Sequence, residues 1–101
     1  MKTRPFSIEL LDEAEVDFDK SYEFYNEDSP KVADVLFQRI NLGLEDIKQN
    51  PNFFPIAHKD VRKHVIKKFP FLIYYRIVET VIQVIAIFHT SRNPKIWNER
   101  I

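Results

Sequence analysis

Residues 67–100 read KKFPFLIYYRIVETVIQVIAIFHTSRNPKIWNER, and this stretch decides the fold. Two apolar runs, Phe69 to Val78 and Val81 to Phe88, are separated only by Glu79 and Thr80. Both runs are rich in β-branched and aromatic residues, and so short a connection is typical of a hairpin. The sequence therefore predicts two antiparallel strands that are buried over much of both faces.

The upstream sequence predicts a short strand and then two helices. Pro5–Leu10 alternates apolar and polar residues, which is the period of a half-buried strand. Asp12 is expected to cap the first helix, and one face of this helix carries apolar residues at spacings of three and four. These residues are Leu11, Ala14, Phe18, Tyr22 and Tyr25. Ser29-Pro30 is expected to start the second helix, about three residues after the first ends, and Asn50-Pro51 to stop it.

The polar side of the first helix is expected to face solvent. Its residues are Glu13, Asp17, Asp19, Lys20 and Glu27. The carboxylates from Asp12 to Asp19 are scattered around the helix, so a solvated face is favoured over a metal cluster.

The order of the predicted elements indicates an α+β fold. Asn50 to Asp60 contains two prolines and no regular period, so we expect a loop, whereas Val61–Ile66 predicts a further strand. The fold is thus an N-terminal strand, an antiparallel hairpin of two helices, and then a mainly antiparallel sheet of three further strands. The helices are expected to cover one face of this sheet. The other face and the C-terminal tail would then be available to a partner.

Composition limits the class of protein. A chain of 101 residues, 45% of them hydrophobic, predicts a single domain over residues 1–101. The absence of cysteine excludes disulfides and thiolate metal sites and favours a reducing compartment. No charged leader precedes an apolar N-terminal segment, and no run approaches the roughly 18 apolar residues that span a bilayer. We therefore expect a soluble cytoplasmic protein that does not enter membranes and needs no cofactor.

The net charge of zero conceals a division along the chain. Residues 1–50 carry six Lys and Arg against twelve Asp and Glu, and residues 51–101 carry nine against three. The halves are therefore −6 and +6. A positive face could still attract phosphate, because salt screens distant acidic charges beyond about 8–10 Å. Ordinary solvated surface explains the same division equally well.

Basic residues of the second half supply candidate binding groups. Arg76 lies in an apolar strand, where a charge needs a partner or a wet cleft. A structural ion pair with Glu79 or a helix carboxylate and a functional role both remain open. The basic residues on the neighbouring segment are Arg62, Lys63, Lys67 and Lys68. They could line one positive groove with Arg76, or they could protect a strand edge from aggregation.

His89 and Arg92 form a His-x-x-Arg pair just after the last predicted strand. Such a histidine could exchange a proton with a ribose hydroxyl while the arginine stabilises charge on the phosphate. A histidine bonded to a loop carbonyl is the alternative. His58 and His64 have neither metal-ligand spacing nor a carboxylate partner nearby in sequence. Trp97 could stack on a base, but we favour its interpretation as an anchor of the C-terminal tail.

Taken together, these segments resemble the RelE/ParE superfamily of type II toxin–antitoxin toxins, along nearly the full chain. The likeness rests on the first helix with AEVDFDKSYEFY, the second with SPKVADVLFQRI, and the basic strand VRKHVIKK. Its most specific parts are FPFLIYYRI and the closing FHTSRNPKIWNER, with its His-x-x-Arg-x-Pro-x-x-Trp pattern. The resemblance implies a compact antiparallel sheet covered by a helical hairpin, which agrees with the fold expected above.

The superfamily implies two different activities. Members similar to RelE cleave messenger RNA on the ribosome with basic residues and a C-terminal acid/base, whereas members similar to ParE, which include plasmid stabilisation proteins, inhibit DNA gyrase. This chain departs from the first pattern, since Leu72 stands near the family's catalytic arginine and Trp97 near its terminal tyrosine. His89 could substitute for that tyrosine.

The resemblance therefore favours a ParE-like growth inhibitor that is neutralised by a cognate antitoxin and acts on DNA gyrase. The alternatives are a RelE-like mRNA endonuclease and a non-toxic binding module on the same fold. For the nuclease, the candidate catalytic residues are Arg62, Arg76, His89 and Arg92. The candidate residues for binding a partner or nucleic acid are Lys63, Lys67, Lys68, Lys95 and Arg100. No metal site and no particular oligomeric state are expected.

Overall fold

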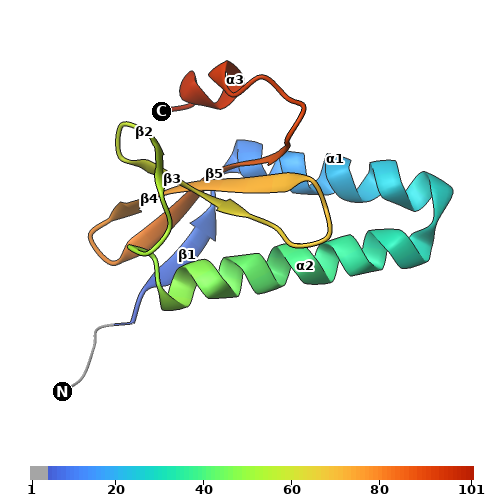
Figure 1. Ribbon diagram of the computed structural model, residues 1–101, viewed down its shortest axis with the longest axis horizontal. Coiled ribbons are helices and arrows are strands. Elements are labelled where there is room, and N and C mark those ends of the chain that lie inside the picture. Colours follow the sequence, from blue (N-terminus) through green and yellow to red (C-terminus); the bar gives the residue numbers. More distant parts are fainter. Residues whose placement is uncertain (1–4) are drawn as a thin grey trace.

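The computed structural model describes residues 5–101 and contains a five-stranded sheet with helices on both sides (Figure 1). The elements are β1 (Ser7–Leu10), α1 (Asp12–Asp28), α2 (Pro30–Gln49), β2 (Ile56–His58), β3 (Val61–Val65), β4 (Phe71–Val78), β5 (Val81–His89) and α3 (Lys95–Asn98). The strand order is β1-β5-β4-β3-β2, with β1 parallel to β5 and every other pair antiparallel. The α+β fold predicted from the sequence is confirmed.

The ends of the helices follow from local chemistry. Ser29 is the only residue between α1 and α2; its backbone amide donates to Tyr25 and its side chain accepts from the amide of Val32. The predicted start of α2 at Ser29-Pro30 is therefore confirmed, although the connection is shorter than expected. The prediction that Asp12 caps α1 was wrong, because Leu11 occupies the cap position and Asp12 is the first helical residue. In the first turn its carboxylate still interacts favourably with the helix dipole.

Two differences from the prediction concern short elements. β2 lies within the segment that was predicted to be a loop, and its three exposed residues show none of the apolar alternation that marks a strand. It pairs with β3 through Ile56 and Arg62. α3 follows β5 and lies on the opposite side of the sheet from α2 (Figure 1). The face expected to be open is therefore partly covered by the chain's own C-terminal segment.

A β-bulge in β5 changes which of its side chains face the helices. Tyr74 pairs with Ala86 but Tyr75 pairs with Val84, so Ile85 is an extra residue in β5. The bulge shifts the alternation of side chains by one position. As a result Val84 and Ile87 both face the helices.

The core is divided between the two faces. On the helical face, the fully buried side chains of α2 pack against Ile73, Tyr75 and Ile82. On the other face, Val61, Tyr74, Ile85, Ala86 and Phe88 pack with Trp97 of α3. No helix within residues 5–101 combines the length and the apolar character that crossing a membrane requires.

Candidate functional site

A buried carboxylate on α1 holds the C-terminal segment in place. Asp17 is only 5% exposed and accepts the backbone amide of Ile87 at 3.1 Å. Arg100 donates to both of its oxygens, Nη1 to Oδ2 at 2.6 Å and Nη2 to Oδ1 at 3.1 Å, and Nη1 of Arg92 lies 3.4 Å from Oδ1. The prediction that Asp17 faces solvent was therefore wrong. A buried charge of this kind is tolerated because it is paired and hydrogen-bonded.

The two arginines that meet Asp17 also cover an aromatic ring. The guanidinium carbon of Arg92 lies 3.8 Å from the centre of the Phe88 ring, and that of Arg100 lies 5.0 Å from it. Nε of Arg100 is 3.2 Å from Glu13 at the surface, a charge contact without the alignment of a hydrogen bond. Hydrogen bonding to Asp17 raises the pKa of Arg100 further. Arg100 was expected to bind a partner, but its guanidinium is bound to Asp17 within the protein. The charge of Arg92 is partly offset by the same carboxylate.

His89 is the last residue of β5 and lies in the same region. Its Nδ1 accepts the backbone amide of Ser91 at 3.0 Å and lies 2.7 Å from the Ser91 hydroxyl. In the neutral ring the proton is therefore on Nε2. His89 and Arg92 line one open pocket of about 360 Å³ between α1 and the end of β5. The structure does bring these two candidate residues together.

Arg62 and Arg76 lie on opposite faces of the sheet. Arg62 is directly opposite Tyr75, on the helical face, and its Nη1 donates to the carbonyls of Asn52 at 3.1 Å and Phe54 at 2.6 Å. Arg76 is on the other face, where its Nε donates to Gln83 at 3.1 Å. The partner of Arg76 is thus an amide and not the carboxylate that was considered. No single groove can contain both arginines.

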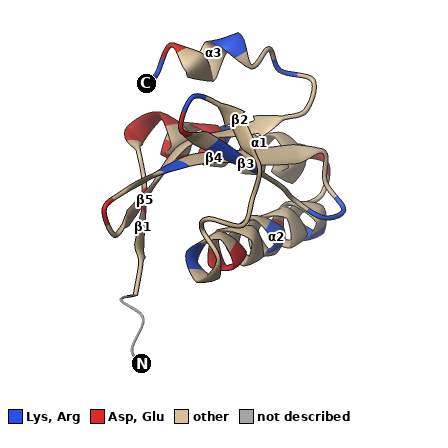
Figure 2. Ribbon diagram, turned by 60° about the vertical axis from the view of Figure 1, so that its left-hand side comes forward, with Lys and Arg blue, Asp and Glu red and all other residues tan. Residues whose placement is uncertain are grey.

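The four candidate lysines are all exposed but dispersed. Lys63 lies on β3, Lys67 and Lys68 occupy the turn before β4, and Lys95 begins α3. Figure 2 shows the basic residues coloured at separate points of the sheet, the turn and α3. Of the four, Lys63 faces the same side of the sheet as Arg76, because it lies opposite Tyr74 of β4.

His64 has a carboxylate partner that the local sequence did not indicate. Its Nε2 is 3.7 Å from Oδ2 of Asp46 on α2, and its ring lies 4.2 Å from that of Phe54. Burial lowers the pKa of His64, and Asp46 partly opposes this effect. A contact between elements so distant in sequence has no local signal. Among residues 5–101, no three His, Asp or Glu side chains are arranged to hold a metal ion.

Trp97 is an anchor of the C-terminal segment, as predicted. It is 2% exposed and stacks on Tyr74, with 4.5 Å between ring centres and 28° between ring planes. Its faces are thus occupied by the protein and are not presented to a base. The interpretation of Trp97 as an anchor is confirmed.

The sequence model of the ParE toxin of type II toxin–antitoxin systems, parDE, matches residues 8–94. The chain belongs to the ParE toxin family. This match confirms the resemblance to the RelE/ParE superfamily. It covers α1, α2, the strands from β2 to β5, β1 apart from Ser7, and the His89–Arg92 pair, and it ends before α3.

Solved structures of toxin–antitoxin systems share the fold of this ParE-family chain. The chromosomal ParDE system from P. aeruginosa aligns with a TM-score of 0.77 at 23% identity, over 86% of this chain and 98% of that one. The RelBE2 complex from Mycobacterium tuberculosis aligns with a TM-score of 0.58 at 13% identity, over 85% and 99%. At these identities the likeness shows the fold alone. No curated protein matched in a sequence comparison.

Proposed function

We propose that this ParE-family chain is the toxin of a type II toxin–antitoxin system, that a cognate antitoxin neutralises it, and that DNA gyrase is its target. The family match over residues 8–94 supports a ParE-type toxin. The similar folds come from a ParDE system and a RelBE2 toxin–antitoxin complex, which supports an antitoxin as partner. The cytoplasm is the proposed location, since it contains both gyrase and a newly made antitoxin.

The dispersal of the candidate catalytic groups favours gyrase over RNA cleavage. Cleavage of RNA requires a proton acceptor at the ribose hydroxyl and a cation at the phosphate within one small site. Arg62 and Arg76 lie on opposite faces of the sheet, and Arg92 lies against Asp17. A single substrate phosphate therefore could not meet all three cations. The separation of these three arginines is the observation on which we base the choice of gyrase over mRNA as the target.

The hydrogen bonds of His89 argue in the same direction. To accept a proton at Nε2, the neutral ring must carry its proton on Nδ1. Nδ1 already accepts the backbone amide of Ser91, so a proton there would oppose that N–H group. His89 is therefore held in the tautomer that donates from Nε2, which does not suit a general base.

One observation keeps the mRNA endonuclease as a second candidate. His89 and Arg92 line the same pocket, together with Lys20 and Ser21 of α1. A nucleotide phosphate in this pocket could meet a cation and a histidine. The RelE-like reaction would then require the contact between Ser91 and Nδ1 of His89 to open, so that the ring can carry a proton on Nδ1, and would require Arg92 to leave Asp17.

Expression in bacteria tests the proposal and separates the candidates. Induction of the chain alone should stop growth, and co-expression of the product of the neighbouring reading frame should restore it. Supercoiling of a reporter plasmid should fall, while primer extension on ribosome-bound mRNA should give no new stops. His89→Ala should remain toxic.

Two results would contradict this proposal. Undiminished growth, together with a neighbouring product that does not bind, would favour a non-toxic binding module. New mRNA stops that disappear in His89→Ala would favour the endonuclease.

A further inference from the structure

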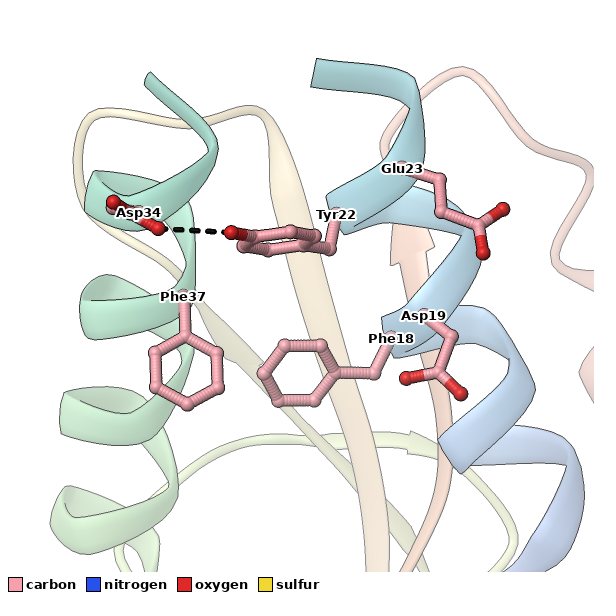
Figure 3. Close-up of a pocket in the computed structure, with 6 residues that line it drawn as sticks. All are labelled: Phe18, Asp19, Tyr22, Glu23, Asp34 and Phe37. Carbon is pink, nitrogen blue, oxygen red and sulfur yellow. Dashed lines mark hydrogen bonds between the residues drawn. The ribbon is translucent and has the colours of Figure 1, made fainter. Parts of the chain in front are cut away.

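The seam between α1 and α2 contains an exposed aromatic groove. Phe18 and Tyr22 project from α1 toward Phe37 of α2 (Figure 3). The ring centres of Phe18 and Phe37 are 5.5 Å apart, and those of Tyr22 and Phe37 are 6.4 Å apart. Phe37 is 49% exposed, and the hollow has a volume of about 380 Å³. These rings thus present apolar surface to solvent.

The groove continues along the helices. A second hollow of about 170 Å³ shares Phe18, Asp19 and Phe37 with the first and extends to Leu10 and Glu15. The aromatic rings are therefore the middle of a longer channel that runs along the α1/α2 seam, which is the shape that an extended or helical segment would occupy.

Carboxylates line this channel on both helices. Glu15, Asp19 and Glu23 recur every fourth residue of α1, and all three are exposed. Like charges at this spacing repel one another. Within residues 5–101 none of the three forms an ion pair. The row therefore lacks the cations that would offset it.

A carboxylate on α2, Asp34, faces the row of α1 carboxylates across the groove, and together they form its acidic rim. Asp34 accepts the hydroxyl of Tyr22 at 2.9 Å, and this bond fixes the ring across the seam (Figure 3). The same bond raises the pKa of Tyr22, so the phenol stays protonated and continues to donate. Asp34 keeps a second oxygen that can accept from a ligand.

We propose that this groove binds a basic amphipathic segment of a protein partner, with an arginine laid over Phe18 and Phe37 and an apolar side chain against the exposed part of Phe37. Aromatic faces attract a guanidinium, and the carboxylates of Asp19, Glu23 and Asp34 can accept its N–H groups. Arginine suits the groove better than lysine, because its planar fork both stacks and bonds to carboxylates. Nucleic acid and acidic segments are repelled by the same rim.

This inference goes beyond the proposed function and does not depend on gyrase being the target. The groove is built from α1 and α2, whereas the His89–Arg92 pocket lies between α1 and the end of β5. The groove can therefore be tested by binding alone, with no toxicity measurement.

A labelled synthetic peptide provides the test. The probe is an amphipathic helical peptide with arginine at every fourth position and leucine between. The control peptide carries citrulline, which is uncharged, in place of each arginine. Fluorescence anisotropy with the full chain should detect binding of the arginine peptide only. Asp19→Lys/Glu23→Lys should weaken binding about tenfold, and Phe37→Ala about threefold.

Matched variants distinguish binding in this groove from nonspecific electrostatic attraction between a basic peptide and the protein. Asp60→Lys/Glu99→Lys makes the same change in net charge at exposed positions outside the groove, and it should change binding less than about twofold. Asp19→Asn/Glu23→Gln keeps the side-chain shapes and should also weaken binding. Equal losses in the two charge-reversal variants, equal binding of the citrulline peptide, or no binding to the unaltered chain would overturn the proposal.

Discussion

Replacing Asp17 with alanine is expected to release the C-terminal segment from α1. The carboxylate holds the backbone amide of Ile87 and both terminal nitrogens of Arg100, whose side chain is only 10% exposed. Removing one partner of a buried ion pair costs about 3–5 kcal/mol, since the other charge is left unpaired. We expect a loss near the lower value, about 3 kcal/mol, because the released Arg100 can return to water.

Trp97 makes the release measurable. It is the only tryptophan of the chain and lies buried against Tyr74, so its emission reports on the C-terminal segment alone. Ordering a segment costs about 1 kcal/mol or more per residue, and the bonds from Asp17 offset part of this cost. Asp17→Ala should therefore shift the emission to longer wavelength at urea concentrations below the main unfolding transition.

Glu13→Gln is the matched control for this experiment. Glu13 contacts the same guanidinium, but its side chain is 65% exposed. Exposed pairs contribute about 0–1 kcal/mol, so this variant should unfold close to the unaltered protein and keep its emission. If Asp17→Ala and Glu13→Gln behave alike, the buried carboxylate does not anchor the segment.

Three further variants test local features. For each variant, unfolding in urea is monitored by circular dichroism. Ser29→Ala removes the side chain that accepts the amide of Val32 and should lower the unfolding free energy by about 1 kcal/mol; no change would show that the cap contributes nothing. Gly43→Val would push a branched side chain where even a Cβ would lie 3.1 Å from Cδ1 of Ile73, so we expect a loss of about 2–3 kcal/mol, and a stable variant would contradict this packing. His64 has a pKa below 6.5 in the folded chain because of burial, so unfolding takes up a proton and stability falls as the pH drops from above 6.5 toward the folded pKa. His64→Gln should flatten that fall as the pH is lowered through 6.5, and an unchanged slope would contradict the assignment.

Elements with strong local signals were predictable from the sequence. The start of α2 follows from Ser29-Pro30, its end from Asn50-Pro51, and the β4–β5 hairpin from two apolar runs with a two-residue break. The role of Trp97 as an anchor followed from the general behaviour of a tryptophan near a chain end. In each case the signal lies within a few residues of the feature.

The errors have a different physical origin. Asp17 lies beside apolar Phe18 on α1, yet it was assigned to the solvent side because its partners, Ile87 and Arg100, are distant in sequence. The separation of Arg62 and Arg76 depends on the register of β3 against β4, where Arg62 lies opposite Tyr75, and periodicity does not reveal this register. Tertiary pairing decides such features, and a single sequence does not display it.

Only part of the candidate site could be predicted, because the rest depends on contacts between residues that are distant in sequence. The His-x-x-Arg spacing indicated His89 and Arg92 as a pair, and both residues line one pocket at the end of β5. The contact of Arg92 with Asp17 and the tautomer fixed by Ser91 depend on three-dimensional placement. These contacts are the reason that the proposed function does not use His89 as a general base.

Inhibition of purified DNA gyrase tests the proposed target most directly. The chain should block ATP-dependent supercoiling of relaxed plasmid, the His89→Ala variant should block it equally, and prior addition of the antitoxin should prevent the block. Gyrase that supercoils normally in excess toxin, while the same preparation cleaves mRNA on ribosomes, would contradict the account.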